Sequence, residues 1–592
     1  MKLQSILTLT LLFIFVSEMS AIRPPRPGVI PSQQVIKEFQ EIQKDYNTGY
    51  WAEKIDARYK LLQENPEFFK TQKELLVDSI YAPTLLGYFT DLHPVYSRGQ
   101  FQALLWDGPN PTGTVTDYYR EVSYGKMHLS GNCEGWFPVQ GPVSSYNPGG
   151  FGGGPRFTYE LLVASDSSVD YSKYVQTIDG SGNGHVPFLV VIHTGGDAAA
   201  GAPNIWSHRW NIRGLPGLSA GYVTNDTLPN GKAIIVDGDY AIQPEMTGNT
   251  NYGGQIEPIG VFAHELGHIF SLPDLYGIGT GAGEGLGGWC LMAAGSYGGD
   301  QRNSAKPSHM SAWCKEKMGW VVPTVVTTDL NNQILQPVEW TQQIYKLWRN
   351  GAPDLQYFLI ENRQKTGFDV SLLESGLLIF HVDNTVATQN NPIRYKVDLE
   401  QADGMRHLNL KTNRGDAGDP YPGTGGANNP NRIFDGYSTP NSKDYSNLTT
   451  GVNVGNIRKV DTLILANISV WDTAFVAPAF TNVTTTAGVS DSSESFGVSA
   501  VDYDNDGWTD IYVTNKTSNR LYKNNRNGTF TNTAVAAGVA DADFNRSGIW
   551  GDYDNDGFND LYVTTYNPIF LTKKNKLFKN NGNGTFTNQT GE

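Results

Sequence analysis

The chain has 592 residues, enough for several domains with substantial buried cores. Its formal net charge of -15 and its lack of any clustered basic stretch argue against a nucleic-acid partner. With 65 glycines and only 17% charged residues, the composition favours loop-rich β structure over long exposed helices.

Residues 1–21 have the pattern of a secretory signal peptide. A short basic start, Met1-Lys2, precedes an apolar core from Leu3 to Val16, and small residues follow at Ser20-Ala21. We therefore expect a secreted, extracellular protein. No later apolar run approaches the roughly 18 residues of a membrane-spanning helix, so no membrane span is expected in the mature chain.

Residues 22–80 form a candidate propeptide. A proline-rich start, Arg23 to Gly28, leads into polar stretches in which apolar residues recur every three or four positions. This spacing predicts small amphipathic helices within Val35–Lys44 and Glu53–Val77. In a secreted protein such a segment is interpreted as a propeptide that makes a zymogen. The alternative is a structural cap that stays attached.

Residues 81–323 are expected to form an α/β domain. The apolar runs Pro83–Asp91 and Val186–His193 are typical of buried strands. The stretch Val261–Phe270 then predicts a helix, because Pro258 suits a first helical position and an apolar surface follows. Pro273 should end that helix.

The predicted helix carries His264-Glu265-x-x-His268. Residues four apart lie on one helix face, so both imidazoles can reach one zinc ion while Glu265 stays beside it. Zinc with an open coordination position lowers the pKa of a bound water to about 7, and a nearby carboxylate can take the proton. Glu265 is the candidate general base. The alternative is a pair of ordinary helix histidines.

A third zinc ligand is needed, and Asp274 is the first candidate because a chain turning back after the helix would bring its carboxylate to the metal. Glu284, in a glycine-rich stretch, is the competing ligand. Met292 is a candidate floor beneath the metal. His208 also lies in a tryptophan-flanked block, where a hydrogen-bonded core histidine is favoured over a catalytic one.

These motifs resemble the immune inhibitor A family of secreted, metzincin-like zinc metallopeptidases. The similarity extends over roughly Ala82 to Val470 and is carried by the blocks Asp239–Glu245, Gly260–His268, Leu272–Tyr276 and Gly288–Ser296. The resemblance implies zinc-dependent hydrolysis of proteins, with His264, His268 and Asp274 as metal ligands and Glu265 as the base.

The chain departs from the family pattern at two positions. Ser271 stands where the family usually has a glycine, which tolerates a left-handed turn that serine adopts at a cost. Gly277 stands where an Asp often follows the tyrosine. The chain has only three cysteines, Cys133, Cys290 and Cys314, so latency through an N-terminal cysteine is excluded, and Cys290 with Cys314 is a possible pair.

Residues 324–475 are expected to form an accessory β-sandwich. Three alternating or apolar segments, Asp354–Arg363, Ser375–Asp383 and Leu463–Val470, predict strands. The acidic stretches at Asp403 and from Asp416 to Asp419 are candidate calcium ligands, although exposed turn carboxylates are the favoured interpretation.

Residues 476–592 contain a repeat. Asp502-Tyr-Asp-Asn-Asp-Gly-Trp-Thr-Asp510 recurs as Asp552-Tyr-Asp-Asn-Asp-Gly-Phe-Asn-Asp560, each followed by a strand-like Ile511–Val513 or Leu561–Val563. Carboxylates at positions one, three, five and nine, with glycine at six, describe a calcium loop. The predicted calcium ligands are Asp502, Asp504, Asp506, Asp510, Asp552, Asp554, Asp556 and Asp560.

The repeats resemble FG-GAP units of integrin-like β-propellers. Because a propeller normally needs at least four blades, we expect an incomplete propeller whose chain continues, or whose blades pack on the β-sandwich or dimerise. A cell-surface or matrix partner through these repeats is a further expectation. Nine Asn-x-Ser/Thr sequons suggest exposed, glycosylated sites: Asn225, Asn447, Asn467, Asn482, Asn515, Asn527, Asn545, Asn583 and Asn588.

The sequence thus predicts a multidomain protein: an α/β zinc metallopeptidase domain, a β-sandwich and propeller-type repeats. Its predicted function is that of a secreted zinc endopeptidase that hydrolyses protein substrates, with calcium in the repeats. The rival is a calcium-dependent adhesion or glycan-binding surface protein in which the zinc site is vestigial.

Overall fold

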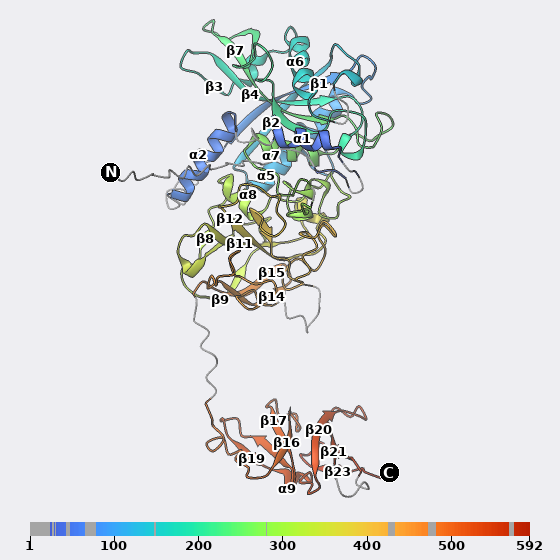
Figure 1. Ribbon diagram of the computed structural model, residues 1–592, viewed down its shortest axis with the longest axis vertical. Coiled ribbons are helices and arrows are strands. Elements are labelled where there is room, and N and C mark those ends of the chain that lie inside the picture. Colours follow the sequence, from blue (N-terminus) through green and yellow to red (C-terminus); the bar gives the residue numbers. More distant parts are fainter. Residues whose placement is uncertain are drawn as a thin grey trace, which may run out of the picture. The chain divides into compact units, whose positions relative to one another are not determined.

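A computed structural model describes residues 24–26, 29, 31–42, 48–64, 78–146, 150–279, 281–423, 432–471, 481–566 and 574–591 (Figure 1). The chain divides into two compact units, Met1–Ala474 and Phe475–Glu592, which we describe one at a time. The expected signal peptide, residues 1–21, lies outside the described residues. Within the described ranges, no helix combines the length and apolarity needed to cross a bilayer.

The first unit is built on a seven-stranded sheet with the order β2-β1-β4-β7-β5, in which β3 also pairs with β4 and β6 with β7. Neighbours among β2, β1, β4 and β7 run parallel, whereas β3, β5 and β6 are antiparallel additions. The strands are β1 (Asp78–Tyr88), β2 (Met127–Pro138), β3 (Thr177–Ile178), β4 (Gly184–His193), β5 (His208–Asn211), β6 (Tyr222–Thr227) and β7 (Ala233–Pro244).

Helices cover both faces of this sheet. Successive side chains of a strand point to opposite faces, so Val190 and Ile192 of β4 enter one apolar core and Leu189 and Val191 enter another. The first core also receives α5 (Val115–Val122) and α7 (Ile259–Ile269), and the second receives α6 (Gly154–Ser165) (Figure 1). A short helix, α4 (Arg98–Gln102), completes this region. The three-layer arrangement is the α/β organisation expected from the sequence.

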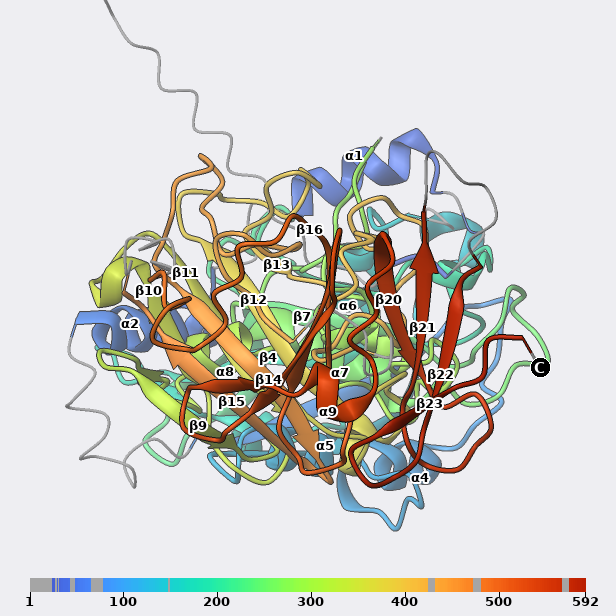
Figure 2. The same ribbon diagram turned by 90° about the horizontal axis from the view of Figure 1, so that it is seen from below.

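Two smaller sheets follow in the same unit, with the orders β13-β12-β11-β10-β8 and β14-β15-β9. Figure 2 shows β10 to β13 next to one another. The elements are α8 (Ala312–Lys317), β8 (Thr324–Val325), β9 (Leu330–Leu335), β10 (Tyr345–Trp348), β11 (Gln356–Arg363), β12 (Gly376–Asp383), β13 (Val397–Leu399), β14 (Asn453–Val460) and β15 (Leu463–Ser469).

The five-stranded sheet is buried on both faces. Phe358 and Ile360 of β11 pack with the three-stranded sheet in a shared core. The alternate residues Tyr357 and Leu359 pack in the same core as helix α7. The boundary expected at residue 323 therefore does not separate two cores, because one face of this sheet completes the hydrophobic core of the α/β part.

The N-terminal segment contains α1 (Gln33–Ile42) and α2 (Tyr50–Glu64), which overlap the helices expected within Val35–Lys44 and Glu53–Val77. The remainder of these two stretches, residues 43–44 and 65–77, lies outside the described residues. Trp51 and Ile55 of α2 are buried in the core that holds α7, and Trp51 makes an edge-to-face contact with Phe270. Strand β1 begins at Asp78, inside the segment interpreted as a propeptide. Helix α2 is therefore an integral part of the folded unit.

The second unit contains two four-stranded antiparallel sheets, β16-β17-β18-β19 and β20-β21-β22-β23, which share one apolar core. Its elements are β16 (Ser495–Val501), β17 (Asp510–Asn515), β18 (Arg520–Asn524), β19 (Phe530–Asn532), α9 (Ala534–Ala537), β20 (Asn545–Gly551), β21 (Asp560–Thr565), β22 (Lys576–Asn580) and β23 (Phe586–Asn588). Among the described residues neither sheet closes on itself, so a propeller is not formed by these two sheets alone.

Two of the expected glycosylation sites are wrong for the folded chain. Asn515 and Asn545 are fully buried. Asn515 donates from Nδ2 to Asp491 Oδ2 at 2.8 Å, and Asn545 donates from Nδ2 to Asp541 Oδ2 at 2.9 Å. In both residues the folded chain buries the amide against a carboxylate from outside the strand, which the three-residue sequon pattern does not reveal.

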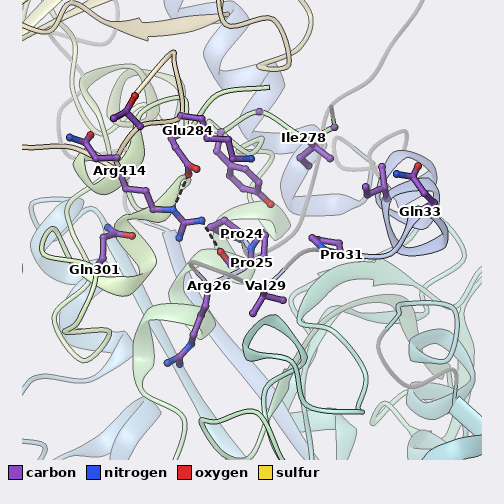
Figure 3. Close-up of a pocket in the computed structure, with 17 residues that line it drawn as sticks. Pro24, Pro25, Arg26, Val29, Pro31, Gln33, Ile278, Glu284, Gln301 and Arg414 are labelled. Carbon is purple, nitrogen blue, oxygen red and sulfur yellow. Dashed lines mark hydrogen bonds and ion pairs between the residues drawn. The ribbon is translucent and has the colours of Figure 1, made fainter. Parts of the chain in front are cut away.

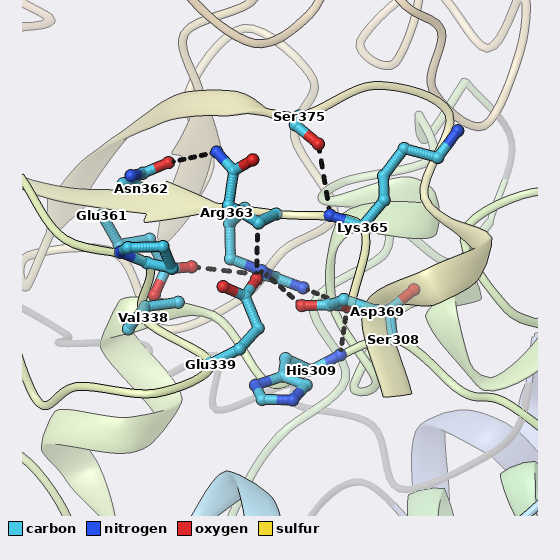
Figure 4. Close-up of polar contacts among 12 residues, drawn as sticks. Ser308, His309, Val338, Glu339, Glu361, Asn362, Arg363, Lys365, Asp369 and Ser375 are labelled. Carbon is cyan, nitrogen blue, oxygen red and sulfur yellow. Dashed lines mark hydrogen bonds and ion pairs between the residues drawn. The ribbon is translucent and has the colours of Figure 1, made fainter. Parts of the chain in front are cut away.

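A buried ionic network joins β11 to the α/β part (Figure 4). Arg363 donates to both carboxylate oxygens of Asp369 at 2.7 Å and to Glu361 Oε1 at 3.1 Å. Its Nη1 also donates to the carbonyl oxygen of Trp289 at 3.1 Å. Glu339 shares this pocket, and burial together with the charge of Asp369 raises its pKa to about 9, although Arg363 opposes the shift.

We expect Glu339→Gln to stabilise the protein at alkaline pH. Because its pKa is raised, Glu339 keeps its proton in the folded state up to about pH 9, whereas in the unfolded state it loses the proton above about pH 4.5. The free energy of unfolding therefore falls as the pH rises from about 4.5 toward about 9. Glutamine mimics the protonated side chain. At about pH 8, the unfolding temperature of the variant should exceed that of the parent by roughly 2–4 °C for each kcal/mol of stability gained. At about pH 5, the two unfolding temperatures should be nearly equal.

Thermal unfolding followed by circular dichroism at both pH values tests this expectation. Glu374→Gln is the matched control, because Glu374 is partly exposed and its pKa is lowered. Ionisation of Glu374 therefore does not destabilise the folded state at alkaline pH. An equal loss of stability for Glu339→Gln at both pH values would show that the ionised carboxylate, and not its protonated form, is the native species.

Candidate metal centre

Helix α7 presents the two histidines on one face and is buried along its whole length, from Ile259 to Ile269. Pro258 precedes it in an extended conformation, as the sequence predicted for the helix start. Gly267 lies against Met292, and a Cβ there would come 2.4 Å from the Met292 sulfur. The glycine between the two histidines thus lets the loop around Met292 pack directly under the helix.

The structure brings His264, His268 and Asp274 together. Asp274 Oδ1 lies 3.0 Å from His264 Nε2 and 3.4 Å from His268 Nε2, and the two Nε2 atoms lie 3.2 Å apart. All three residues are buried. Glu265, next to His264 on the helix, is buried as well, and its charge and that of Asp274 contribute, after burial, to the raised pKa of Tyr276.

Backbone carbonyls fix the orientation of both imidazoles. His264 Nδ1 lies 2.8 Å from the carbonyl oxygen of Leu291, and His268 Nδ1 lies 2.7 Å from that of Leu272. A carbonyl only accepts, so each Nδ1 carries the hydrogen and each Nε2 of a neutral imidazole directs a lone pair into the shared space. Two nitrogens and one carboxylate oxygen converging in this way form a donor set that zinc accepts.

Without a metal, the electrostatics of the site favour a proton on His264 and not on His268 or Asp274. Burial lowers the pKa of His264, but the hydrogen bond and charge of Asp274 and the charge of Glu265 outweigh it and raise this pKa to about 9. Burial raises the pKa of Asp274, whereas the charge of His268 and the hydrogen bonds from both histidines lower it overall. A positive charge is therefore favoured between these groups, which a divalent cation would supply.

Ser271 adopts the left-handed conformation, with φ of 65°, a backbone region that a serine adopts at a cost. Its hydroxyl donates to Asp56 Oδ1 of α2 at 2.8 Å, and Lys317 pairs with the same oxygen at 2.7 Å. The serine thus turns the chain toward Asp274 and is held in that turn by the N-terminal segment. No sequence pattern pointed to Asp56.

Other residues singled out from the sequence lie elsewhere. Glu284, the competing ligand, pairs with Arg414 at 2.9 Å and is not grouped with the histidines. His208 is a buried core histidine, with Nε2 3.0 Å from Tyr240 Oη. The sulfurs of Cys290 and Cys314 lie 3.9 Å apart, and their pairing stays a prediction.

The proline-rich segment lies against the residues that follow Asp274 (Figure 3). Tyr297 Oη donates to the carbonyl oxygen of Pro24 at 2.7 Å, and Arg414, which pairs with Glu284, donates to that of Pro25 at 2.7 Å. This segment borders a cavity of about 630 Å³ that is also lined by Tyr276.

In the second unit, the acidic loops bring most of their predicted ligands together. One group consists of Asp502, Asp504 and Asp510, and the other of Asp552, Asp554 and Asp560, with carboxylate oxygens within 4.8 Å of one another. Asp506 and Asp556 are outside these groups and pair with Lys523 at 3.4 Å and Lys579 at 3.1 Å. The same lysines contact Asp504 and Asp554.

Comparisons with known proteins identify the class of this site. Residues 89–321, which contain the histidines, Glu265 and Asp274, match the family described as immune inhibitor A peptidase M6, catalytic domain. Residues 502–563 match the FG-GAP-like repeat. The chain therefore carries a metallopeptidase domain.

Residues 89–321 thus resemble the catalytic domain of immune inhibitor A, and the resemblance predicted from the sequence is confirmed. The chain is 31% identical over 210 residues to immune inhibitor A of Bacillus thuringiensis subsp. alesti, an overlap of 31% of this chain and 29% of that protein. It is 28% identical over 257 residues to the pre-pro-metalloprotease PrtV of Vibrio cholerae serotype O1, an overlap of 38% of this chain and 26% of PrtV. The matched part spans less than a third of each relative.

We expect Asp274→Asn to weaken zinc binding and Glu284→Gln to leave it unchanged. Asp274 lies within 3.4 Å of both Nε2 atoms, whereas Glu284 pairs with Arg414. Residues that only orient metal ligands contribute up to roughly 100-fold to metal affinity, so loss of a ligand itself should lower the affinity by at least that factor. Zinc titration against a competing chelator, with the two purified variants side by side, measures the difference. Zinc binding impaired by Glu284→Gln instead would transfer the third ligand to Glu284.

Proposed function

We propose that the protein is a secreted zinc endopeptidase that hydrolyses peptide bonds in protein substrates. The observation that carries the proposal is the convergence of His264, His268 and Asp274 beside Glu265, within the segment that matches the M6 catalytic domain. The expected signal peptide supports secretion. The relative named a pre-pro-metalloprotease supports synthesis as a precursor.

The residues divide the work of hydrolysis. The two histidines and Asp274 would hold zinc, which supplies Lewis-acid polarisation of the scissile carbonyl and makes water more acidic. Glu265 accepts the proton of the attacking water and passes it to the leaving amine. The carbonyl oxygens of Leu291 and Leu272 keep the imidazoles in the tautomer that leaves Nε2 available.

Replacing Glu265 by Gln should lower casein hydrolysis by at least about 100-fold, because a general base typically contributes 10²–10⁴-fold to the rate. Zinc content should stay near that of the parent, since Glu265 is not a ligand in this proposal. Activity and metal content are measured on the same preparation. Glu160→Gln, which changes a buried glutamate on α6, is the control for a general effect of burying an amide. Full activity in Glu265→Gln would refute the assignment of the base.

We further propose that the segment before α2 keeps the enzyme latent by covering the approach to the site. Its contacts with Tyr297 and Arg414 lie beside Tyr276, two residues after Asp274. A second anchor is Arg26, whose guanidinium is 3.6 Å from Asp197 and whose backbone nitrogen donates to Ala199. Helix α2 should remain after activation, because removing Trp51 and Ile55 would open the core.

Cleavage at a specific protease site introduced at residues 43–47, followed by separation of the released piece, tests this proposal. We expect casein hydrolysis to rise by at least about tenfold, which corresponds to roughly 1.4 kcal/mol of inhibitory contact. The same cleaved protein carrying Glu265→Gln is the background control. Unchanged activity after the piece has dissociated would support the structural-cap alternative.

For the second unit we propose two calcium sites, built on Asp502, Asp504 and Asp510 and on Asp552, Asp554 and Asp560. The repeated grouping of carboxylates supports them. Lys523 and Lys579 would have to move away from Asp504 and Asp554 when the ion binds. A cell-surface or matrix partner for these repeats remains part of the proposal, and calcium-dependent binding retained in Glu265→Gln would separate it from proteolysis.

A further inference from the structure

The segment before α2 is held largely by its backbone. Tyr297 Oη donates to the carbonyl oxygen of Pro24, and Arg414 Nη2 donates to that of Pro25, both at 2.7 Å. The backbone nitrogen of Arg26 donates to a carbonyl oxygen in the chain that follows β4, at 3.0 Å. These hydrogen bonds use atoms that peptide backbones share, so the surface that makes them can hold another peptide in the same way.

The surface that holds this segment adjoins the candidate metal centre. Tyr276 follows Asp274 by two residues and lines the cavity of about 630 Å³ that the proline-rich segment borders (Figure 3). Burial raises the pKa of Tyr276 well above its usual range, and the charges of Asp274 and Glu265 and the hydroxyl of Tyr297 add to this shift. Tyr276 thus lies within reach of both the metal centre and Tyr297, which binds the segment.

The segment also covers an apolar surface of the first unit. Val35 of α1 is buried in a small apolar cluster, and Val29 and Ile36 are partly buried against it. The other members of this cluster come from outside the segment: Phe151, Ala198, Ala199, Trp206, Trp210 and Ile278. Release of the segment would expose this surface, and contiguous apolar surface of this kind is a common feature of binding grooves.

A buried carboxylate in this groove faces a basic side chain of the segment. Asp197 is fully buried, and Arg26 Nε lies 3.6 Å from its Oδ2 as an ion pair. The other oxygen of Asp197 accepts from the backbone nitrogen of Ala199 at 2.8 Å and caps the short helix Ala198–Ala200. Because a carboxylate removed from water is stabilised by a nearby positive charge, release of the segment favours another cation at this point.

We infer that Asp197 is a specificity-determining residue, which selects peptide substrates that carry a basic side chain at the place of Arg26. The inference rests on the proposed function, because it takes the segment to lie along the path of the substrate. The backbone of a substrate would accept from Tyr297 and Arg414, while Asp197 distinguishes one side chain. A neutral side chain of similar size, such as glutamine, would leave the buried carboxylate without this charge compensation.

The capping role of Asp197 does not require its charge. Asparagine caps helices about as well as aspartate, so Asp197→Asn removes the charge and keeps an oxygen for the nitrogen of Ala199. The matched control is Asp170→Asn. Asp170 caps another short helix, Tyr171–Tyr174, by accepting from the backbone nitrogen of Ser172 at 3.1 Å.

Peptide cleavage by the full chain, cut at residues 43–47 and separated from the released piece, tests the inference. Cleavage sites in casein, mapped by mass spectrometry, should show Arg or Lys enriched at one fixed position relative to the cut bond. Two peptides that differ only by Arg or Gln at that position are then compared. We expect kcat/KM to be at least about tenfold higher for the Arg peptide, and the ratio to fall below about twofold in Asp197→Asn.

Asp170→Asn should keep the ratio of the parent. Casein cleavage without enrichment of basic residues would overturn the inference and leave the proposed proteolysis intact. The same holds for a ratio that Asp197→Asn does not change.

Binding of the segment itself gives a second test that needs no hydrolysis. A fluorescent peptide of residues 22–42 is titrated into the cut chain carrying Glu265→Gln, and its Arg26→Gln version is titrated in parallel. We expect Arg26→Gln to weaken binding at least about tenfold, but less than about twofold when the chain also carries Asp197→Asn. Equal weakening in both chains would overturn the inference. This coupling in a protein whose parent hydrolyses no casein would refute only the proposed function.

Discussion

The contact on which the peptidase unit depends is between the two imidazole nitrogens, 3.2 Å apart in the protein interior. Each is held there by a carbonyl oxygen behind it, that of Leu291 for His264 and that of Leu272 for His268. Two lone pairs at this distance repel unless a proton or a metal lies between them. The fold must therefore supply rigid support to both carbonyls.

That support comes from parts of the chain far apart in sequence. Leu291 follows Trp289, whose carbonyl oxygen accepts from Arg363 of the five-stranded sheet and whose indole donates to Asp419. Leu272 follows the left-handed Ser271, which is tied to Asp56 of α2. The five-stranded sheet thus supports the site through the loop at Trp289, and helix α2 supports it through the turn at Ser271. The same segments join one hydrophobic core that continues from residues 81–323 into the five-stranded sheet.

The sequence was informative where a local pattern carries the chemistry. The spacing of His264 and His268 requires only a helix, and strands such as β4 and β11 follow from apolar runs that any sheet would bury. The repeated acidic loops could be predicted for the same reason, because the spacing of their carboxylates is a local pattern. Asp274 was harder, because its approach to the histidines depends on a turn at Ser271 whose stabilising partner lies 215 residues earlier. No local sequence pattern predicts such a partner.

Contacts between distant segments also explain the errors. The carboxylate of Asp419 looks like a turn residue in sequence, but the indole of Trp289, 130 residues earlier, buries it. The sequons at Asn515 and Asn545 fail because each buried amide donates to a carboxylate, that of Asp491 or Asp541, which the fold brings to it. In each case the side chain is polar and locally suited to solvent, and a partner brought by the tertiary fold outweighs that preference. Burial of a polar group is stable only with its partners, and here those partners come from segments that the local sequence does not reveal.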